Sequence, residues 1–121
     1  MNIAIDFDGT VVTHEYPNVG VPVDNAVEVL DKIITAGHNI ILFTMRSGKE
    51  LQDAVDWYKS YNIPLFGINT NPNQLRWTSS PKAWADLYID DCGINCPVRL
   101  QNGFRVVDWK EIEKILFNEK Y

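Results

Sequence analysis

Short apolar runs alternate with amphipathic stretches along most of the chain. The runs are typical of buried strands, and they lie at residues 2–5, 39–44, 64–68 and 85–89. Between the first three runs, apolar residues recur at helical spacing, which predicts two intervening helices. Alternating strands and helices predict parallel crossover units. We therefore expect an α/β fold, a doubly wound, Rossmann-like, mostly parallel sheet with helices on both faces.

Capping residues predict where the first two helices begin and end. Asp24 is a suitable N-cap for the first helix, and Gly37 is placed to end it. Ser47 and Glu50 have the spacing of a capping box at the start of the second helix.

The last part of the chain predicts a hairpin and a final helix. Asn102-Gly103 favours a tight turn between strands at residues 98–101 and 104–107. Asp108 and Glu111 then have capping spacing before an amphipathic stretch.

Length and charge narrow the class of protein. The 121 residues suit a single domain over residues 1–121, and the net charge of −5 disfavours a long nucleic acid or an anionic membrane as partner. No stretch approaches the roughly 20 apolar residues of a membrane span, and no secretory signal is visible, so we expect a cytoplasmic protein. Cys92 and Cys96 are expected to be reduced thiols, because their spacing is not C-x-x-C.

Acidic residues cluster directly after two of the predicted strands. Asp6 and Asp8 follow the first strand and point to the same side, because strand side chains alternate with period two. Two carboxylates held together repel, so one must take up a proton or share a cation. Asp90 and Asp91 follow the fourth strand, at the edge where such sheets bind ligands. This layout is that of a nucleophile and an acid–base partner beside a divalent metal.

In chain order, these residues resemble the four motifs of the haloacid dehalogenase-like (HAD) superfamily of phosphohydrolases. The matching residues are Asp6-Phe7-Asp8-Gly9-Thr10, Thr44, Lys82 and Tyr88-Ile89-Asp90-Asp91. The resemblance covers nearly the whole chain and is to the small cap-less members. The stretches at residues 10–24 and 69–85, where a cap is inserted in other members, are too short or otherwise occupied, so we expect no cap domain.

The resemblance implies a Mg²⁺-dependent phosphatase that hydrolyses a phosphate monoester through an aspartyl-phosphate on Asp6. Asp8 would protonate the leaving oxygen and then activate water. Asp6, Asp8, Asp90 and Asp91 would hold the metal. Whether Asp90 or Asp91 is the direct ligand stays open, because Asp90 stands where the motif usually has glycine.

Substrate contacts are implied at four further residues. Thr44 would donate to a phosphate oxygen, and the amides of Met45 and Arg46 would add anion binding at a helix start. Lys82 would place a compact positive charge on the phosphoryl group and Asp6. The Arg46 side chain fits a substrate contact and a surface position at the helix start equally well.

The expected partner is a phosphorylated small molecule bound in an open site. A second copy of the chain is a candidate lid, which makes a homo-oligomer compatible with the sequence. Trp77, in a polar loop, is a candidate for substrate contact or a subunit interface. His14, Tyr16 and Asn18 lie in the loop after the first motif, where the leaving group should sit.

Two other classes of function remain open. A receiver-like phosphoacceptor signalling module also clusters acids, a Thr and a Lys on a doubly wound sheet. Its phosphoacceptor follows the third strand, however, and here residues 67–69 contain no acid. The third class is a non-catalytic interaction protein with a vestigial site, although no motif residue is missing.

Overall fold

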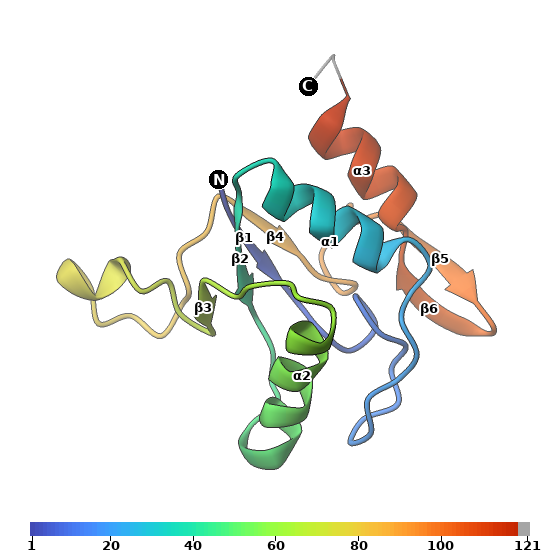
Figure 1. Cartoon of the computed structure of the whole chain (residues 1–121), viewed down its shortest axis with the longest axis horizontal. Helices are drawn as coiled ribbons and strands as arrows, with labels where there is room; N and C mark the ends of the chain where they lie inside the picture. Colours follow the sequence, from blue (N-terminus) through green and yellow to red (C-terminus); the bar gives the residue numbers. More distant parts are fainter. Residues whose placement is uncertain (119–121) are drawn as a thin grey trace.

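The computed structural model describes residues 1–118 as a parallel sheet with three α-helices and a separate hairpin (Figure 1). In chain order the elements are β1 (Asn2–Ile5), α1 (Ala26–Thr35), β2 (Asn39–Leu42), α2 (Gly48–Ser60), β3 (Gly67–Ile68), the 3₁₀ helix η1 (Gln74–Arg76), β4 (Leu87–Ile89), β5 (Val98–Gln101), β6 (Phe104–Val107) and α3 (Trp109–Phe117). The sheet order is β3-β2-β1-β4, and all its pairs are parallel. The expected α/β class is confirmed.

Three neighbouring strands, β2, β1 and β4, end at the same level. Ile5 of β1 is paired with Leu42 of β2 on one side and with Ile89 of β4 on the other. The residues that follow these strands therefore emerge side by side at one edge of the sheet. This is the edge where parallel sheets bind ligands.

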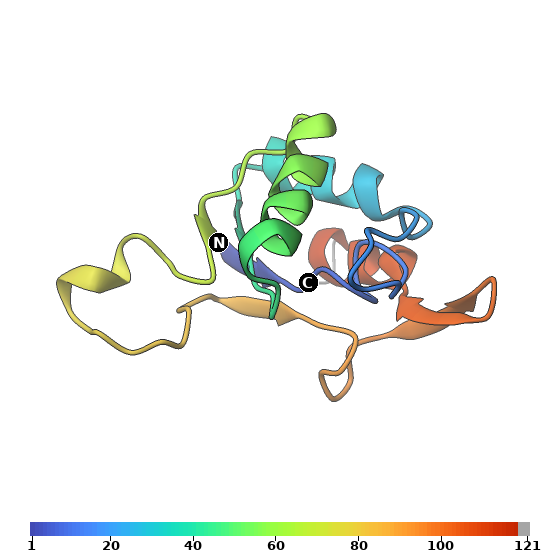
Figure 2. The ribbon, with the colours of Figure 1, turned by 90° about the horizontal axis from the view of Figure 1, so that it is seen from below.

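All three α-helices described in residues 1–118 pack against the same face of the sheet. Ile3 and Ile5 are fully buried in one cluster with apolar residues of α1, α2 and α3. Right-handed crossovers from β1 to β2 and from β2 to β3 run in the same direction, so α1 and α2 must share a face. Figure 2 shows these two helices together above the strands.

The other face of the sheet is not covered by a helix in the described structure. The chain must cross back from β3 to β4 over that face, and this connection contains only η1. A small buried cluster of Ala4, Ile41 and Ala83 joins it to the sheet. The connection carries Pro72 and Pro81, which lack backbone N–H donors, and this disfavours a helix. The expectation of helices on both faces is thus not met.

Of the three predicted N-caps, one is wrong, one has the predicted position without the capping hydrogen bond, and one is confirmed. The N-cap of α1 is Asn25, with a φ of +67°, while Asp24 forms an ion pair with Arg99 at 3.1 Å. Ser47 is the N-cap residue of α2, as predicted, but its side chain makes no capping hydrogen bond. Asp108 does cap α3, because its Oδ1 accepts from the Glu111 amide at 3.2 Å.

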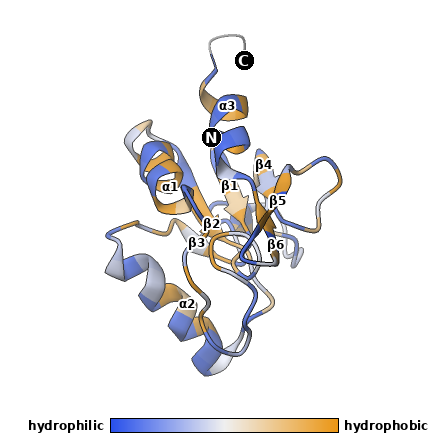
Figure 3. Cartoon of the chain, turned by 90° about the vertical axis from the view of Figure 1, so that its right-hand side faces the viewer, coloured by the Kyte–Doolittle hydropathy of each residue, from blue (hydrophilic) through white to orange (hydrophobic). Residues whose placement is uncertain are grey.

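The strands match the predictions in part. The hairpin strands have the predicted bounds, and its turn residues have φ values of +51° at Asn102 and +84° at Gly103. β3 and β4 are shorter than predicted, because pairing begins only at Gly67 and Leu87. Figure 3 shows mostly apolar strands and helices of alternating character. None of the helices in residues 1–118 has both the length and the apolar content needed to span a membrane.

Candidate functional site

A pocket of about 410 Å³ opens at the edge of the sheet where β1, β2 and β4 end. Its lining residues come from these strand ends and from the loop after β1. They are Asp6, Asp8, His14, Tyr16, Thr44, Met45, Arg46, Asp90, Asp91 and Cys92. The register of the strands therefore brings most of the expected site residues into one cavity.

A buried threonine hydroxyl joins the end of β1 to the end of β4. Thr10 Oγ1 lies 3.0 Å from Asp6 Oδ2 and 3.4 Å from Asp91 Oδ1. The same oxygen accepts the Asp91 amide at 3.2 Å. One O–H can donate to only one carboxylate at a time, so either Asp6 or Asp91 lacks the hydrogen bond from Thr10 at any moment.

Asp6 is held in surroundings that oppose its ionisation. Its pKa is raised to about 8, first by burial, then by the negative charge of Asp90 and by a side-chain hydrogen bond with Asp91. Hydrogen bonds from Thr10 and the Phe7 backbone act in the opposite direction but do not cancel these effects. A divalent cation beside these acids would oppose the shift, because its positive charge favours the ionised carboxyl group.

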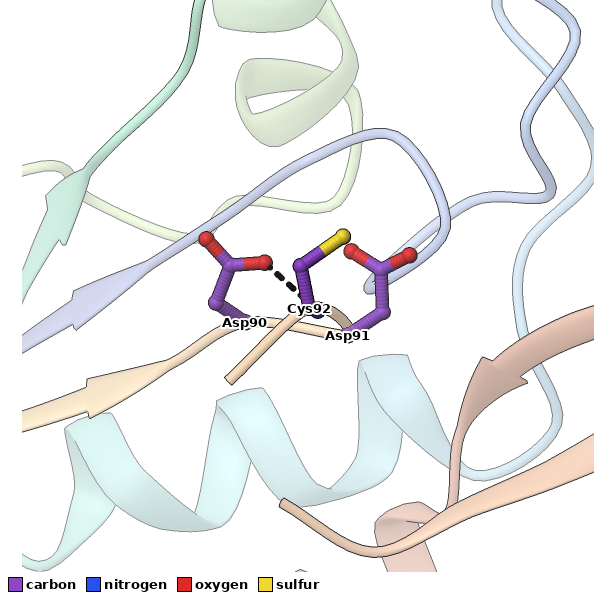
Figure 4. A group of neighbouring side chains, drawn as sticks. All are labelled: Asp90, Asp91 and Cys92. Atoms are coloured by element: carbon purple, nitrogen blue, oxygen red, sulfur yellow. Dashed lines mark hydrogen bonds between the residues drawn. The ribbon is translucent and has the colours of Figure 1, made fainter. Parts of the chain in front are cut away.

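The residues after β4 offer the ligand atoms for such a cation. One ligand atom each from Asp90, Asp91 and Cys92 can lie within 4.8 Å of one another. Figure 4 shows the three side chains pointing from the end of β4 toward the loop after β1. Carboxylate oxygens suit Mg²⁺, whereas a thiolate suits softer metals. Asp90 and Asp91 thus supply oxygen donors of the kind that Mg²⁺ prefers, and Cys92 adds a sulfur donor that it does not.

Cys92 and Arg105 at this site were not expected from the sequence. Arg105 Nη2 lies 3.7 Å from Asp91 Oδ2 and 3.8 Å from Cys92 Sγ. Arg105 reaches the site from β6, and no spacing in the sequence relates a hairpin residue to the fourth motif. Cys92 directly follows the predicted acids, so its position was the available signal.

Asp8 faces Arg46. Arg46 Nε donates to Asp8 Oδ2 and Nη2 donates to Asp8 Oδ1, both at 2.8 Å. Arg46 is 3% exposed, so it is not a surface residue at the start of α2. Any metal ligation by the Asp8 carboxylate would share its oxygens with this guanidinium.

Thr44 is fixed by two hydrogen bonds, each from a backbone amide to a side-chain oxygen. Its amide donates to Asn69 Oδ1 at 2.8 Å, and its Oγ1 accepts from the Arg46 amide at 3.1 Å. The Thr44 O–H can still donate into the pocket, but the Arg46 amide is already used within the chain. Met45 is 99% exposed and lies on the pocket rim. No sequence signal points to Asn69, because an asparagine in a polar loop carries no distinctive spacing.

Lys82 does not line the pocket. Its Nζ lies over the ring of Tyr88, 5.7 Å from the centroid, and residues 1–118 include no ion pair between Lys82 and Asp6. Tyr88 and Asp90 are two residues apart and so face the same side of the sheet. Lys82 thus lies on the same side of the sheet as Asp90, but it contacts Tyr88, two residues before Asp90.

Trp109 connects the last helix to the first loop. Its buried side chain donates Nε1–H to the Thr10 carbonyl oxygen at 2.7 Å. The indole packs in the apolar core, and its hydrogen bond also holds the backbone next to Thr10.

Comparisons with known proteins yield one informative match. No family model matches the chain, and no curated protein is similar to it. Among solved structures, a conserved protein from Bacteroides thetaiotaomicron is similar, with a TM-score of 0.82 and 33% sequence identity. The match covers 100% of this chain and 92% of that chain.

Proposed function

The chain belongs to the same family as the conserved protein from Bacteroides thetaiotaomicron, and we propose that it is a Mg²⁺-dependent phosphatase of the cap-less HAD type. Its substrate would be a phosphate monoester, and Asp6 would be the nucleophile. The α/β sheet and the order of the site residues along the chain are compatible with this class.

One observation carries the proposal. Asp6, Asp90 and Asp91 converge from two neighbouring strands, and the pKa of Asp6 is raised to about 8 there. Such a concentration of negative charge is costly for a fold and is typical of a functional site. It becomes favourable when a divalent cation and a phosphoryl group bind between the acids.

The proposed reaction has two steps at phosphorus. An Asp6 carboxylate oxygen attacks the phosphorus atom, a P–O bond to Asp6 forms, and the ester P–O bond breaks. Asp8 lies at the same pocket, paired with Arg46; to give a proton to the leaving oxygen, it would first take up that proton on the oxygen released from one arm of this pair. Water then attacks the aspartyl-phosphate, losing a proton to Asp8, and inorganic phosphate leaves as the Asp6–P bond breaks.

The other pocket residues would bind and orient the substrate. The Thr44 hydroxyl would donate to a phosphate oxygen, and Met45 lines the same pocket. Mg²⁺, held by Asp6, Asp90 and Asp91, would neutralise charge on the phosphoryl oxygens. Lys82 would need to swing from Tyr88 toward Asp6 to add its positive charge.

A single substitution tests the proposal. The purified protein is assayed against a panel of phosphate esters that includes 4-nitrophenyl phosphate, with Mg²⁺ and with EDTA. We expect Mg²⁺-dependent release of inorganic phosphate by the wild type, and a loss of at least about 10³-fold in Asp6→Asn. Asp31→Asn, on the exposed side of α1, is the matched control and should keep full activity.

Two results would overturn the proposal. Full hydrolysis by Asp6→Asn would exclude Asp6 as the nucleophile. Stable labelling of the wild type by acetyl phosphate without turnover would favour a receiver-like phosphoacceptor.

A further inference from the structure

We propose that Arg46 is a positioning residue that fixes Asp8 and the loop after β1 relative to each other. It acts through these groups and does not bind the phosphoryl group. This inference rests on the proposed phosphatase function, and it replaces the direct substrate contact expected of the Arg46 side chain from the sequence.

Every N–H of the Arg46 side chain has an acceptor within the chain. Nε donates to Asp8 Oδ2, and Nη2 donates to Asp8 Oδ1 and to the Asn18 carbonyl oxygen at 2.9 Å. Nη1 donates to the carbonyl oxygens of Pro17 at 3.2 Å and Glu50 at 3.1 Å. A guanidinium has five N–H donors, one on Nε and two on each Nη, so none is left for a phosphate oxygen.

The guanidinium is also enclosed by aromatic rings. Its central carbon lies 5.1 Å from the ring centroid of Phe7 and 5.2 Å from that of Tyr16. The hydrogen bond to Asp8 raises the pKa of Arg46. A buried cation of this kind is stable only with its charge partner in place, so Arg46 and Asp8 hold each other in position.

Arg46 therefore sets the distance between Asp8 and one wall of the pocket. The loop that carries Pro17 and Asn18 also carries His14 and Tyr16, which line the pocket. The leaving group should lie between this wall and Asp8, because Asp8 is the proposed proton donor. A planar fork can fix a carboxylate and two carbonyl oxygens together, whereas a lysine ammonium cannot do so with the same geometry.

Inorganic phosphate distinguishes positioning from phosphate binding. Phosphate is the product and would contact the same groups as the phosphoryl group of the substrate. A phosphate-binding arginine would lose phosphate affinity when replaced, whereas a positioning arginine would lose turnover. A purely structural residue would lower the melting temperature without changing selectivity.

The experiment compares Arg46→Met and Arg46→Lys with the wild type. We expect Arg46→Met to lower kcat by at least about 30-fold, with the Ki of inorganic phosphate within about threefold of the wild type. The ratio of kcat/KM for 4-nitrophenyl phosphate over acetyl phosphate should differ from that of the wild type, because the wall that contacts the leaving group is loosened. Arg46→Lys should recover part of kcat, and full recovery would contradict the role of the fork.

The test includes a matched control variant and a second pair of variants in case Arg46→Met does not fold. Arg99→Met removes an exposed arginine that pairs with Asp24 and should leave all three quantities unchanged. If Arg46→Met does not fold, phosphate binding is compared between Asp8→Asn and the double variant Asp8→Asn/Arg46→Met, in which no charge is stranded. A rise of tenfold or more in the Ki or Kd of phosphate on loss of Arg46 would overturn the inference.

Hydrogen exchange separates this inference from the proposed function. Loss of Arg46 should speed amide exchange in residues 14–18 whether or not the protein is a phosphatase. A wild type that turns over none of the esters would refute the proposed phosphatase function. Unchanged amide exchange in residues 14–18 on loss of Arg46 would refute the positioning role of Arg46.

Discussion

Gly9 lies where any side chain would collide with the proposed metal site. A Cβ built on Gly9 would be 2.6 Å from Asp91 Oδ2, and the residue has a φ of +80°. The glycine thus lets the first loop approach the end of β4 closely enough for Asp6 and Asp91 to share Thr10. This explains in physical terms why a glycine follows the two acids.

Gly9→Ala should therefore displace Asp91 and weaken the site. We expect about tenfold or greater loss of apparent Mg²⁺ affinity in a titration of activity, because shifted ligands bind metals less tightly. Gly103→Ala is the matched control, since Gly103 has a similar φ of +84° but nothing within 4 Å of an added Cβ. Equal effects of the two substitutions would show that backbone strain alone is responsible.

The raised pKa of Asp6 predicts a pH dependence of stability in EDTA. The pKa is about 8 in the folded protein against an ordinary 3.8, so the folded state binds more protons between these values. Wild-type stability should fall as the pH rises from about 4 to about 8, by on the order of a few kcal/mol at most, since the carboxyl keeps some solvent contact.

Asp6→Asn carries no titrating group and should escape this loss. Its melting temperature should exceed that of the wild type clearly at pH 9 and much less at pH 5, with saturating Mg²⁺ narrowing the gap at pH 9. A gap that does not depend on pH would contradict the assignment.

The residues of the site could be predicted better than their contacts. Asp6, Asp90 and Asp91 stand directly after apolar runs, and strand alternation with parallel pairing makes them converge. The partner of Asp8 could not be predicted, because Arg46 lies 38 residues away and its rotamer depends on the tertiary fold. The expected contact between Lys82 and Asp6 is absent from residues 1–118 for a related reason. The order of residues along the chain does not tell how far a loop extends along a sheet.

At the scale of the elements, local signals were reliable only where no distant partner intervened. The hairpin was predicted to the residue, because Asn102-Gly103 fixes both turn and register. Asp24 was wrong as a cap because its carboxylate pairs with Arg99, 75 residues away. Ser47 has a capping spacing but not the geometry.

Ser47 and Asp108 allow a direct comparison of an N-cap residue without a capping hydrogen bond and one with it. Asp108→Ala should lower the free energy of unfolding by about 1 kcal/mol, because it removes the acceptor for the Glu111 amide. Ser47→Ala should change it by less than about 0.5 kcal/mol, because no capping bond is lost. Urea denaturation measures both, and equal losses would mean that Ser47 caps α2 in solution.

At the scale of the whole molecule, the missing second layer follows from one connection. The alternation of strands and helices predicted a sheet covered on both faces, but the segment between β3 and β4 lacks helical periodicity. It is held instead by buried polar side chains. Gln74 Oε1 accepts the Trp84 amide at 2.8 Å, and its Nε2 donates to the carbonyl oxygens of Ser80 and Lys82 at 3.2 and 3.0 Å.

Gln74→Leu should loosen this connection without unfolding the core. Buried backbone groups lose partners, which favours local opening, so tryptic cleavage after Arg76 and Lys82 should speed up by about tenfold. The melting temperature should fall by only a few degrees, because the connection adds little to the main apolar core. Gln52→Leu, an exposed glutamine on α2, is the control. Unchanged cleavage in Gln74→Leu would contradict the proposed role.

The indole hydrogen bond from Trp109 to Thr10 has a consequence for biosynthesis. A ribosome makes Thr10 well before Trp109. While the intervening residues are being added, the nascent chain carries its acidic loop without the group that secures the loop's backbone. The site can reach its final shape only after Trp109 has emerged, so a chain interrupted before α3 would not present the finished pocket.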